Sequence, residues 1–433
     1  MEREFRRRKR KGLRTLSGNL LLLAFFLFLL LCPASLENDV KPMGVAEILK
    51  RTTVESPSPT IKSIRFIIRS TVTFVNNGSS TWSLTEEDKA IGFFMNNSWQ
   101  TVLPINHSHP LETIAEDEDD NLVAILDLQR YLEPGEKLTY SVSYDILSKP
   151  RIIPDLDESD SGTVDEIPEY LREKYCTSES PWLTDNEDIR KTASKIAGNE
   201  TRILTVIKKF VAWIWENIRY PSQPHEVPFY PNETLENKEG DCDDQAILFV
   251  TFCRIYGIPS FIQVGCVHLP RFYANTTAWN GHVRHELKQI GWHGWAMAYI
   301  PPWGWLPIDL TFVMGSLDDS INAIKNGAVT LPETIQYMNI SRIDYVASTR
   351  TYRNFLQQNN FCLYSTDEMI MTFLGDLNGD FVVNILDITI VAELFGSKAG
   401  EPAWNDMADV AEPYGLINII DVAQVAVDFG KTV

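Results

Sequence analysis

The sequence predicts a multidomain α+β protein with an N-terminal antiparallel β-sandwich, a central α/β core and a small all-α calcium-loop module at the C-terminus. With 433 residues the chain is too long for one ordinary domain. Its hydrophobic pattern alternates every second residue in the first third and then takes helical spacing. The predicted divisions are 1–35 (signal peptide or membrane anchor), 36–60 (linker), 61–150 (β-sandwich), 151–184 (acidic connector), 185–345 (central domain), 346–370 (linker) and 371–433 (calcium-loop module).

The charge balance excludes one class of partner. Asp and Glu number 58 against 39 Lys and Arg, which gives a net charge of -19. Nucleic-acid binding needs a clustered positive field, and the one basic cluster runs from Arg3 to Arg14. We therefore expect no nucleic-acid partner.

The basic cluster belongs to a targeting segment. It precedes the apolar run Leu20–Cys32, which is short of the roughly 20 residues that cross a bilayer, and small residues follow as at a cleavage site. We expect a secreted, extracellular or cell-surface protein that touches a membrane only through an uncleaved N-terminal segment. Glycosylation sequons agree with export, at Asn77, Asn96, Asn106, Asn199, Asn232, Asn275 and Asn339.

Residues 61–150 have the alternation of β-strands. The runs 64–74, 122–128 and 138–144 are rich in β-branched and aromatic residues, and turn residues separate them. This pattern predicts the sandwich. The acidic run 116–120 is either a cation site or, as we favour, a solvated hairpin tip.

After the acidic connector the period becomes helical. Residues 185–197 and 202–218 are predicted helices because their apolar residues recur at three- and four-residue steps. One face of the second helix should pack into a core through Leu204, Ile207, Phe210, Val211, Ile214 and Trp215.

One cysteine stands at the start of a predicted helix. Cys242 precedes the apolar positions of 246–256, so the positive end of the helix dipole would stabilise its thiolate, which is the nucleophilic form. The neighbouring acids Asp241, Asp243 and Asp244 would raise its pKa if they pointed at it, so a base is needed nearby. Cys253 and Cys266 are expected to be buried and inert, and the pairing of the cysteines is left open.

A histidine and an aspartate on two predicted strands could supply that base. If the strands are adjacent, His293 and Asp309 align, so that the imidazole deprotonates the thiol and the carboxylate fixes its tautomer. A metal site made of other residues is not favoured because they lie in a loop without a Cys/His cage; these residues are His268, His282, His285 and Glu286.

Ordered motifs in this region resemble the transglutaminase-like superfamily: Tyr220, Thr234-Leu235, Gly240-Asp-Cys242, Gly257-Ile-Pro259, His293-Gly-Trp295 and Gly304 to Thr311. The resemblance implies a papain-like α/β core with Cys242 as nucleophile, His293 as general base and then acid, and Asp309 orienting the imidazole. It also implies an oxyanion hole that includes backbone N–H groups around Cys242.

The C-terminal residues show calcium-loop spacing. Side-chain oxygen ligands stand at loop positions 1, 3, 5, 9 and 12, which are Asp376, Asn378, Asp380, Asn384 and Asp387. The backbone carbonyl of Val382 would be the ligand at position 7. A second copy retains Asn418 and Asp421, although its loop is one residue longer and contains Pro413. The repeat resembles a type I dockerin, which implies structural Ca²⁺ and a cohesin-bearing scaffold protein as partner. Phe381 departs from the usual glycine.

These residues favour a secreted cysteine enzyme that acts on amide bonds of a protein or peptide through a Cys242 thioester, with peptidase-type hydrolysis expected and no catalytic cofactor. The alternatives are a protein-crosslinking transglutaminase, which transfers the acyl group to an amine, and a non-catalytic scaffold or binding protein attached through its dockerin. A glycan-degrading enzyme lacks support because no carboxylate pair stands out.

Overall fold

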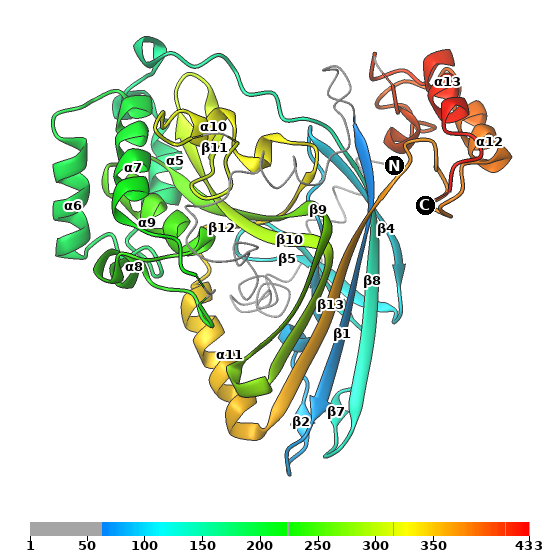
Figure 1. Ribbon diagram of the computed structural model, residues 1–433, viewed down its shortest axis with the longest axis horizontal. Coiled ribbons are helices and arrows are strands. Elements are labelled where there is room, and N and C mark those ends of the chain that lie inside the picture. Colours follow the sequence, from blue (N-terminus) through cyan, green and yellow to red (C-terminus); the bar gives the residue numbers. More distant parts are fainter. Residues whose placement is uncertain (1–62, 223–224, 315, 412, 433) are drawn as a thin grey trace.

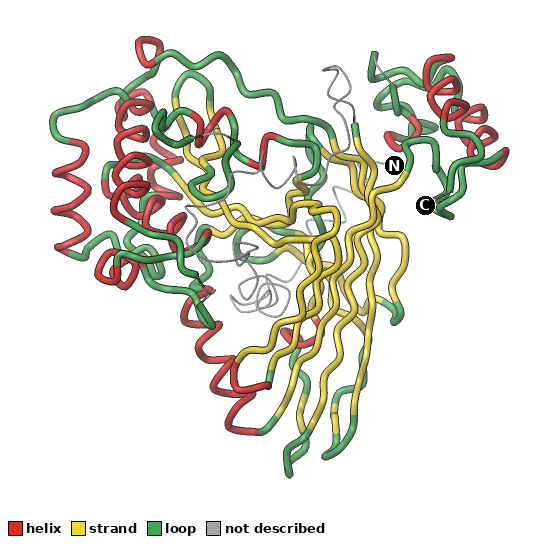
Figure 2. The backbone as a smooth tube through the Cα atoms, viewed as in Figure 1, coloured by secondary structure: helices red, strands yellow, loops and turns green. Residues whose placement is uncertain are grey.

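The computed structural model describes residues 63–222, 225–314, 316–411 and 413–432, so the predicted signal peptide or anchor and the first predicted linker lie outside it. The fold is mixed α/β around one nearly closed sheet (Figures 1 and 2). The strand order is β12-β9-β10-β13-β1-β8-β4, and β11 pairs with β10. The bounds are β1 Ile64–Asn76, β4 Gln100–His107, β8 Lys137–Ser148, β9 Ser260–Ala278, β10 Val283–Ile300, β11 Gly304–Ile308, β12 Thr334–Ile340 and β13 Phe361–Thr372.

The strands of residues 61–150 do not confirm a separate sandwich. β1 lies between β8 and β13, antiparallel to both, so the central sheet joins the N-terminal strands to those of the central domain. The remaining strands form a three-stranded sheet, β3-β6-β5, and a two-stranded one, β2-β7. Their bounds are β2 Trp82–Ser83, β3 Ala90–Gly92, β5 Leu111–Glu116, β6 Leu122–Leu126 and β7 Tyr131–Leu132.

The alternation seen in the sequence places one face of β1 in the core. Phe66, Ile68, Val72 and Phe74 are buried in one continuous hydrophobic cluster that reaches the helices. Tyr144 of β8 belongs to this cluster, and its hydroxyl donates to the Gly92 carbonyl at 2.6 Å, which fixes the smaller sheet against the larger. The N-terminal strands and the central domain therefore share one core.

Helices cover one side of the sheet, to the left in Figure 1. The two predicted helices are confirmed as α6 (Glu187–Ala197) and α7 (Ile203–Asn217). Asn186 caps α6 by accepting from the Asp188 and Ile189 N–H groups. The other helices of this part are α4 Glu86–Lys89, α5 Glu169–Tyr175, α8 Pro231–Asn237, α9 Cys242–Ile255, α10 Asn322–Lys325 and α11 Tyr345–Asn359.

The prediction that residues 346–370 form a linker is wrong, because these residues have regular secondary structure. They form most of α11 and the greater part of β13. Asp344 caps α11, and β13 pairs with β1 in antiparallel and β10 in parallel orientation. The segment is therefore part of the central sheet, because β13 supplies the backbone partners that β1 needs.

The C-terminal module has its own small core. Helices α12 (Ile385–Glu393) and α13 (Ile419–Val427) enclose Val383, Val391, Ala408, Val410, Ile417 and Val425. Its loops contact the end of the central sheet: the Arg69 guanidinium lies 5.0 Å from the centroid of the Phe381 ring, and the Tyr414 and Ser63 hydroxyls are 2.9 Å apart. Among the described residues, no helix has the length and apolar character needed to cross a membrane.

Candidate active site

Cys242 is the first residue of α9, whose residues from Cys242 to Arg254 are all buried. Asp241 caps the helix, and its N–H donates to the Asp244 carboxylate at 3.3 Å. The thiol therefore lies at the positive end of a helix dipole. Gly240 is required here, because a Cβ at this position would lie 2.7 Å from the Asp244 Cβ and 2.9 Å from a Thr234 methyl group. This close packing explains why glycine stands at position 240 in the motif Gly240-Asp-Cys242, beside Thr234 of the motif Thr234-Leu235.

The acids around Cys242 have partners of their own. The Asp244 carboxylate contacts His225 Nδ1 at 2.8 Å and accepts from the Phe229 N–H at 2.7 Å. Asp243 accepts from the Tyr345 hydroxyl at 3.4 Å. Sequence reasoning missed His225 and Tyr345, since neither stands in a motif.

His225 is held by two carboxylates. Burial lowers its pKa, but the hydrogen bonds and charges of Asp244 and Glu239 outweigh burial, so the pKa is raised above its ordinary value. Among the described residues, two sets bring three possible metal-ligand atoms within 4.8 Å of one another, and both surround the start of α9: His225, Asp241 and Asp244; and Asp241, Cys242 and Asp243.

His293 lies on β10, and Asp309 directly follows the neighbouring strand β11. β10 and β11 are antiparallel, and His293 Nε2 lies 3.0 Å from Asp309 Oδ2, with both side chains fully buried. With the carboxylate ionised, Nε2 carries the proton and donates, which leaves Nδ1 as the ring atom that can accept one. The Trp295 and Phe312 rings lie against the imidazole, at centroid distances of 5.7 and 5.5 Å.

The Asp309 carboxylate is fixed by backbone donors. Thr311 and Phe312 donate N–H groups to Oδ1 at 3.2 and 2.9 Å, and Ala328 donates to Oδ2 at 3.1 Å. A Cβ at Gly327 would lie 2.6 Å from the Asp309 Cβ, so only glycine lets this loop approach so closely. The carboxylate therefore has one orientation, directed at the imidazole.

A second histidine–carboxylate pair joins His285 of β10 to Asp367 of β13. His285 Nε2 is 2.8 Å from Asp367 Oδ2, which also accepts from Trp292 Nε1 at 2.8 Å. His268 and His282 lie apart from it: burial lowers the pKa of His268 to about 4, and His282 Nδ1 is 2.8 Å from the Phe361 carbonyl oxygen. His268, His282 and His285 therefore each have different surroundings. Glu286 contacts the Thr366 and Tyr273 hydroxyls.

The first of the two predicted calcium loops contains two buried carboxylates. Asp376 accepts N–H groups from Gly379 at 2.9 Å and Phe381 at 3.0 Å, and Asp387 accepts from the Asn384 N–H at 2.8 Å. Burial raises the pKa of Asp376, and the charge of Asp387 adds to this. A divalent cation between the two would relieve their repulsion, so the residues fit Ca²⁺.

The remaining predicted ligands of this loop also lie along it. The Asn378 amide donates to Asp380 at 3.0 Å, and the Asn384 amide donates to the Val382 carbonyl at 3.2 Å. Phe381 has a φ of 68°, the left-handed conformation that favours glycine.

The second loop keeps two buried carboxylates as well. Asp421 accepts from the Ala411 and Asn418 N–H groups at 3.0 and 2.7 Å. Asp409, which is 2% exposed, accepts from the Gly415 N–H at 2.8 Å. The prediction did not include Asp409 as a ligand, although it holds the place of Asp376 in the first loop.

Comparison with known proteins gives the class of the central domain. Residues 190–310 match the family model of the transglutaminase-like superfamily, so this segment is a transglutaminase-like domain. Cys242, His293 and Asp309 all lie within it. No curated protein matches the chain.

Three solved structures illustrate the neighbours. A "Putative Cysteine Protease" from Cytophaga hutchinsonii aligns at 15% identity over 71% of this chain and 89% of its own, with a TM-score of 0.45. The periplasmic domain of TgpA from Pseudomonas aeruginosa aligns at 14% identity over 64% and 96%, with a TM-score of 0.26. Red sea bream transglutaminase aligns at 12% identity over 59% and 47%, with a TM-score of 0.19. At these scores the likenesses carry no further argument.

Proposed function

We propose that the protein is a cysteine enzyme that attacks amide carbonyls through Cys242 and hydrolyses the resulting thioester. The observation that carries this proposal is the buried His293–Asp309 pair, in a transglutaminase-like domain whose cysteine begins a buried helix. A carboxylate held by three backbone N–H groups and directed at an imidazole is expensive to bury, and catalysis is a use that explains it.

The reaction follows from these positions. His293 Nδ1 takes the proton of the Cys242 thiol, and the thiolate attacks the amide carbon of a protein or peptide substrate. The C–N bond then breaks, the amine leaves with the proton from His293, and a thioester remains on Cys242. His293 next deprotonates a water molecule, which attacks the thioester; the carboxylic acid leaves and the thiol is restored.

Two features lower the barriers. Asp309 holds the imidazole in the tautomer with the proton on Nε2 and stabilises the imidazolium that forms. The start of α9 is the positive end of a helix dipole, which favours the negative charge that develops on the oxyanion of the tetrahedral intermediate. The proposed mechanism uses only side chains and backbone groups of this chain and no metal or cofactor.

One experiment separates the three functions considered. The purified protein would be incubated with fluorescein-labelled casein, with and without a fluorescent primary amine, beside a Cys242→Ala variant. Hydrolysis predicts peptide release that depends on Cys242 and is unaffected by the amine. Incorporation of the amine would instead show a crosslinking transglutaminase, and equal signals from both proteins would favour a non-catalytic binding role.

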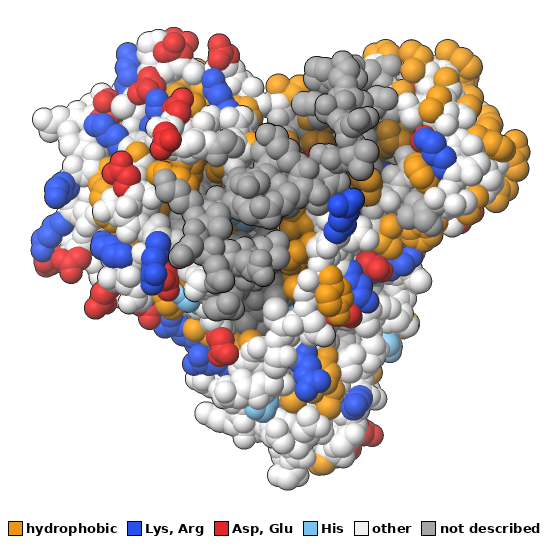
Figure 3. All heavy atoms as spheres, in the orientation of Figure 1, with side chains coloured by type: hydrophobic (Ala, Val, Ile, Leu, Met, Phe, Trp, Pro, Cys, Tyr) orange, Lys and Arg blue, Asp and Glu red, His pale blue; other side chains and the backbone are white. Residues whose placement is uncertain are grey.

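We further propose that the C-terminal module binds structural Ca²⁺ and docks onto a cohesin-bearing scaffold. Calcium is supported by the buried carboxylates Asp376 and Asp387, and in the second loop by Asp421 with Asn418. Docking is supported by equivalent apolar residues at the two helix starts, Ile385 and Leu386, Ile419 and Ile420, which are exposed. Apolar side chains gather over this module in Figure 3.

Secretion or cell-surface attachment belongs to the same proposal, and it rests on residues 1–35. Pull-down with an immobilised cohesin, with and without EGTA, tests the docking. Binding that needs calcium supports it, and the absence of binding in calcium overturns it.

A further inference from the structure

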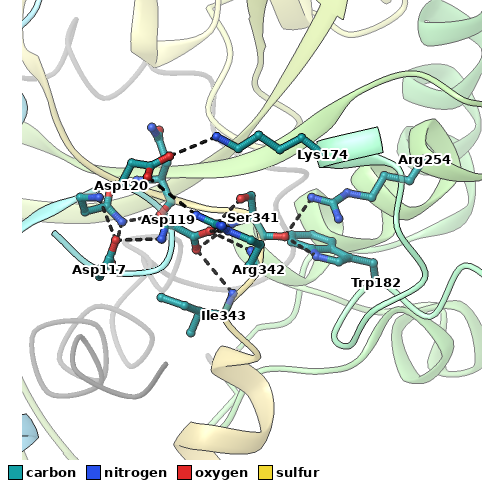
Figure 4. A network of polar contacts seen from close by, with 11 residues as sticks. Asp117, Asp119, Asp120, Lys174, Trp182, Arg254, Ser341, Arg342 and Ile343 are labelled. Carbon is teal, nitrogen blue, oxygen red and sulfur yellow. Dashed lines mark hydrogen bonds and ion pairs between the residues drawn. The ribbon is translucent and has the colours of Figure 1, made fainter. Parts of the chain in front are cut away.

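The hairpin between β5 and β6 carries a buried acid. Its tip is folded by Asp117, whose carboxylate accepts the N–H groups of Asp119 at 2.9 Å and Asn121 at 2.8 Å. These bonds turn the Asp119 side chain inward, where it is fully buried, toward the chain between β12 and α11 (Figure 4). The acidic run that was expected to be a solvated tip therefore has two buried members.

Asp119 organises the segment 341–345. Its two carboxylate oxygens accept from the Ser341 N–H at 2.9 Å, the Ser341 hydroxyl at 2.7 Å and the Arg342 N–H at 2.9 Å, with the Ile343 N–H at 3.4 Å (Figure 4). A buried carboxylate that accepts several backbone N–H groups is a strong, charge-assisted anchor. Asn121 adds a second tie, with bonds of 2.8 Å to and from the backbone of Asn339.

The segment 341–345 contacts the last turn of α9, the helix that begins with Cys242. The Ser341 carbonyl accepts from Arg254 Nη2 at 3.1 Å, and Arg254 is the buried arginine near the end of α9. The same carbonyl accepts from Trp182 Nε1 at 2.8 Å, and the Arg254 guanidinium lies 4.0 Å from the centroid of the Trp182 ring.

The same segment also touches the first turn of α9. The Tyr345 hydroxyl donates to Asp243, the neighbour of Cys242, at 3.4 Å. Burial raises the pKa of Tyr345 well above its ordinary value, and the charges of Asp243, Asp244, Asp241 and Cys242 add to this. The phenol therefore faces the cysteine end of the helix.

A third contact reaches α8, which packs against α9. Asp344 accepts from the Tyr230 hydroxyl at 3.2 Å, and Tyr230 caps α8. The segment 341–345 thus contacts α9 at both ends and the helix beside it. Three successive N–H groups of the segment, those of residues 341–343, donate to one carboxylate from the N-terminal part of the chain, that of Asp119.

We propose that Asp119 is a positioning residue for Cys242: it fixes the segment 341–345, which sets the place of α9 relative to the strand that carries His293. This inference rests on the proposed function, since it concerns the same nucleophile. It makes the N-terminal strands part of the catalytic unit, and it assigns a role to an acidic run that lies outside residues 190–310.

The test compares Asp119→Asn with Asp120→Asn in the full chain. Asn keeps the shape of Asp119 but presents an amide to donors that need an acceptor. Asp120 is the matched control, because it is exposed on the same hairpin, pairs with Lys174 at 3.1 Å and meets the segment through the Arg342 guanidinium at 3.9 Å, whereas Asp119 accepts from backbone N–H groups of the segment. Alkylation of each cysteine by iodoacetamide is followed by mass spectrometry between pH 5 and 9. Cys253 and Cys266, which are fully buried, report unfolding.

We expect Asp119→Asn to lower the rate of Cys242 alkylation at pH 7 by about tenfold and to raise its apparent pKa, since misplacing reacting groups by about an ångström costs up to roughly 10²-fold. Cys253 and Cys266 stay unlabelled, and Asp120→Asn behaves as wild type. A folded Asp119→Asn protein with the wild-type profile would overturn the proposal.

If Asp119→Asn does not fold, Ser341→Ala decides, because it removes only the hydroxyl bond to Asp119. A smaller shift in the same direction supports the proposal, and an unchanged profile overturns it. A failure of the proposed function looks different: Cys242 of the wild-type protein would then show no lowered pKa, whatever the state of residue 119.

Discussion

Strand β10 contains two histidines, and each is paired with a carboxylate from another part of the chain in a similar way. His293 and Asp309 are joined at 3.0 Å, and His285 and Asp367 at 2.8 Å; in both pairs Nε2 faces the carboxylate and the side chains are buried. They differ in their surroundings. Asp309 accepts three backbone N–H groups, whereas Asp367 accepts from the indole of Trp292.

The surroundings of the imidazoles differ as well. The part of β10 with His285 pairs with β13 inside the sheet, and His285 Nδ1 has no hydrogen-bond partner among the described residues. Both halves of β10 pair with β9; beyond His293 the strand also pairs with β11, and β10 packs against α9, the helix that begins with Cys242. A buried histidine–carboxylate pair therefore defines no active site by itself, because catalysis also needs a nucleophile within reach of the other ring nitrogen.

The largest effect is expected from the nucleophile. Cys242→Ala should lower amide cleavage by at least roughly 10³-fold, because none of the other described cysteines begins a helix. Cys362→Ala is the control. The Cys362 sulfur lies 3.9 Å from His282 Nδ1, but this nitrogen faces the Phe361 backbone carbonyl at 2.8 Å. Cleavage of labelled casein should be normal in the control. Loss of activity in both variants would show that the comparison is wrong.

Asp309→Asn should give the next largest effect. The amide cannot hold the imidazole in the tautomer that accepts the thiol proton, so kcat should fall by roughly 10²- to 10⁴-fold with KM little changed. Kinetics on the folded protein measure this. A variant with kcat within a few-fold of wild type would remove Asp309 from the mechanism.

Asp367→Asn should instead affect stability. Removing one partner of a buried ion pair should lower the free energy of unfolding by about 3–5 kcal/mol, while the folded protein keeps its kcat. Urea unfolding beside the kinetic assay checks both. A large fall in kcat without loss of stability would give the second pair a catalytic role.

The same variant has a pH signature. Burial raises the pKa of Asp367, but the hydrogen bond and charge of His285 outweigh burial and hold the pKa below its ordinary value. The stability that this carboxylate contributes is thus present above the unfolded pKa, near 3.9, and is lost as the pH falls through the folded pKa. The difference between wild type and Asp367→Asn should shrink below about pH 4. A difference that grows on acidification contradicts this.

Calcium should have the smallest effect on the site. At about 100 times its Kd, a bound ion stabilises the C-terminal module by about 2.7 kcal/mol, so EGTA should lower the unfolding temperature of that module. Amide cleavage should not change, since the module contacts the sheet end and has its own core. The double variant Asp387→Asn, Asp421→Asn should abolish the response to calcium, because it changes one buried carboxylate in each loop. A calcium response that survives this double variant would place the ion elsewhere.

The sequence predicted what is local and missed what is not. Helices α6 and α7 follow from apolar spacing, and the contact of His293 with Asp309 follows from two strands joined by a short turn. The pairing of β1 with β13 joins segments that lie far apart in the sequence, and no local pattern encodes it. For this reason residues 346–370 were mistaken for a linker.

The same limit applies to the site. Tyr345 reaches α9 from a distant segment, Asp119 holds that segment, and neither residue belongs to a motif. The acidic run 116–120 showed charge, but charge alone does not reveal that Asp119 is buried against backbone N–H groups. His285 and His293 are equally visible in the sequence, and only the structure separates their surroundings.

The most direct test is the pH dependence of Cys242 alkylation in three proteins: wild type, His293→Ala and His285→Ala. The mass-spectrometric assay needs no substrate. The account predicts an apparent pKa clearly below the roughly 8.5 of a free thiol in wild type and in folded His285→Ala, and loss of this shift in His293→Ala. An unshifted Cys242 in wild type, or a shift that survives the loss of His293, would contradict the assignment of the active site.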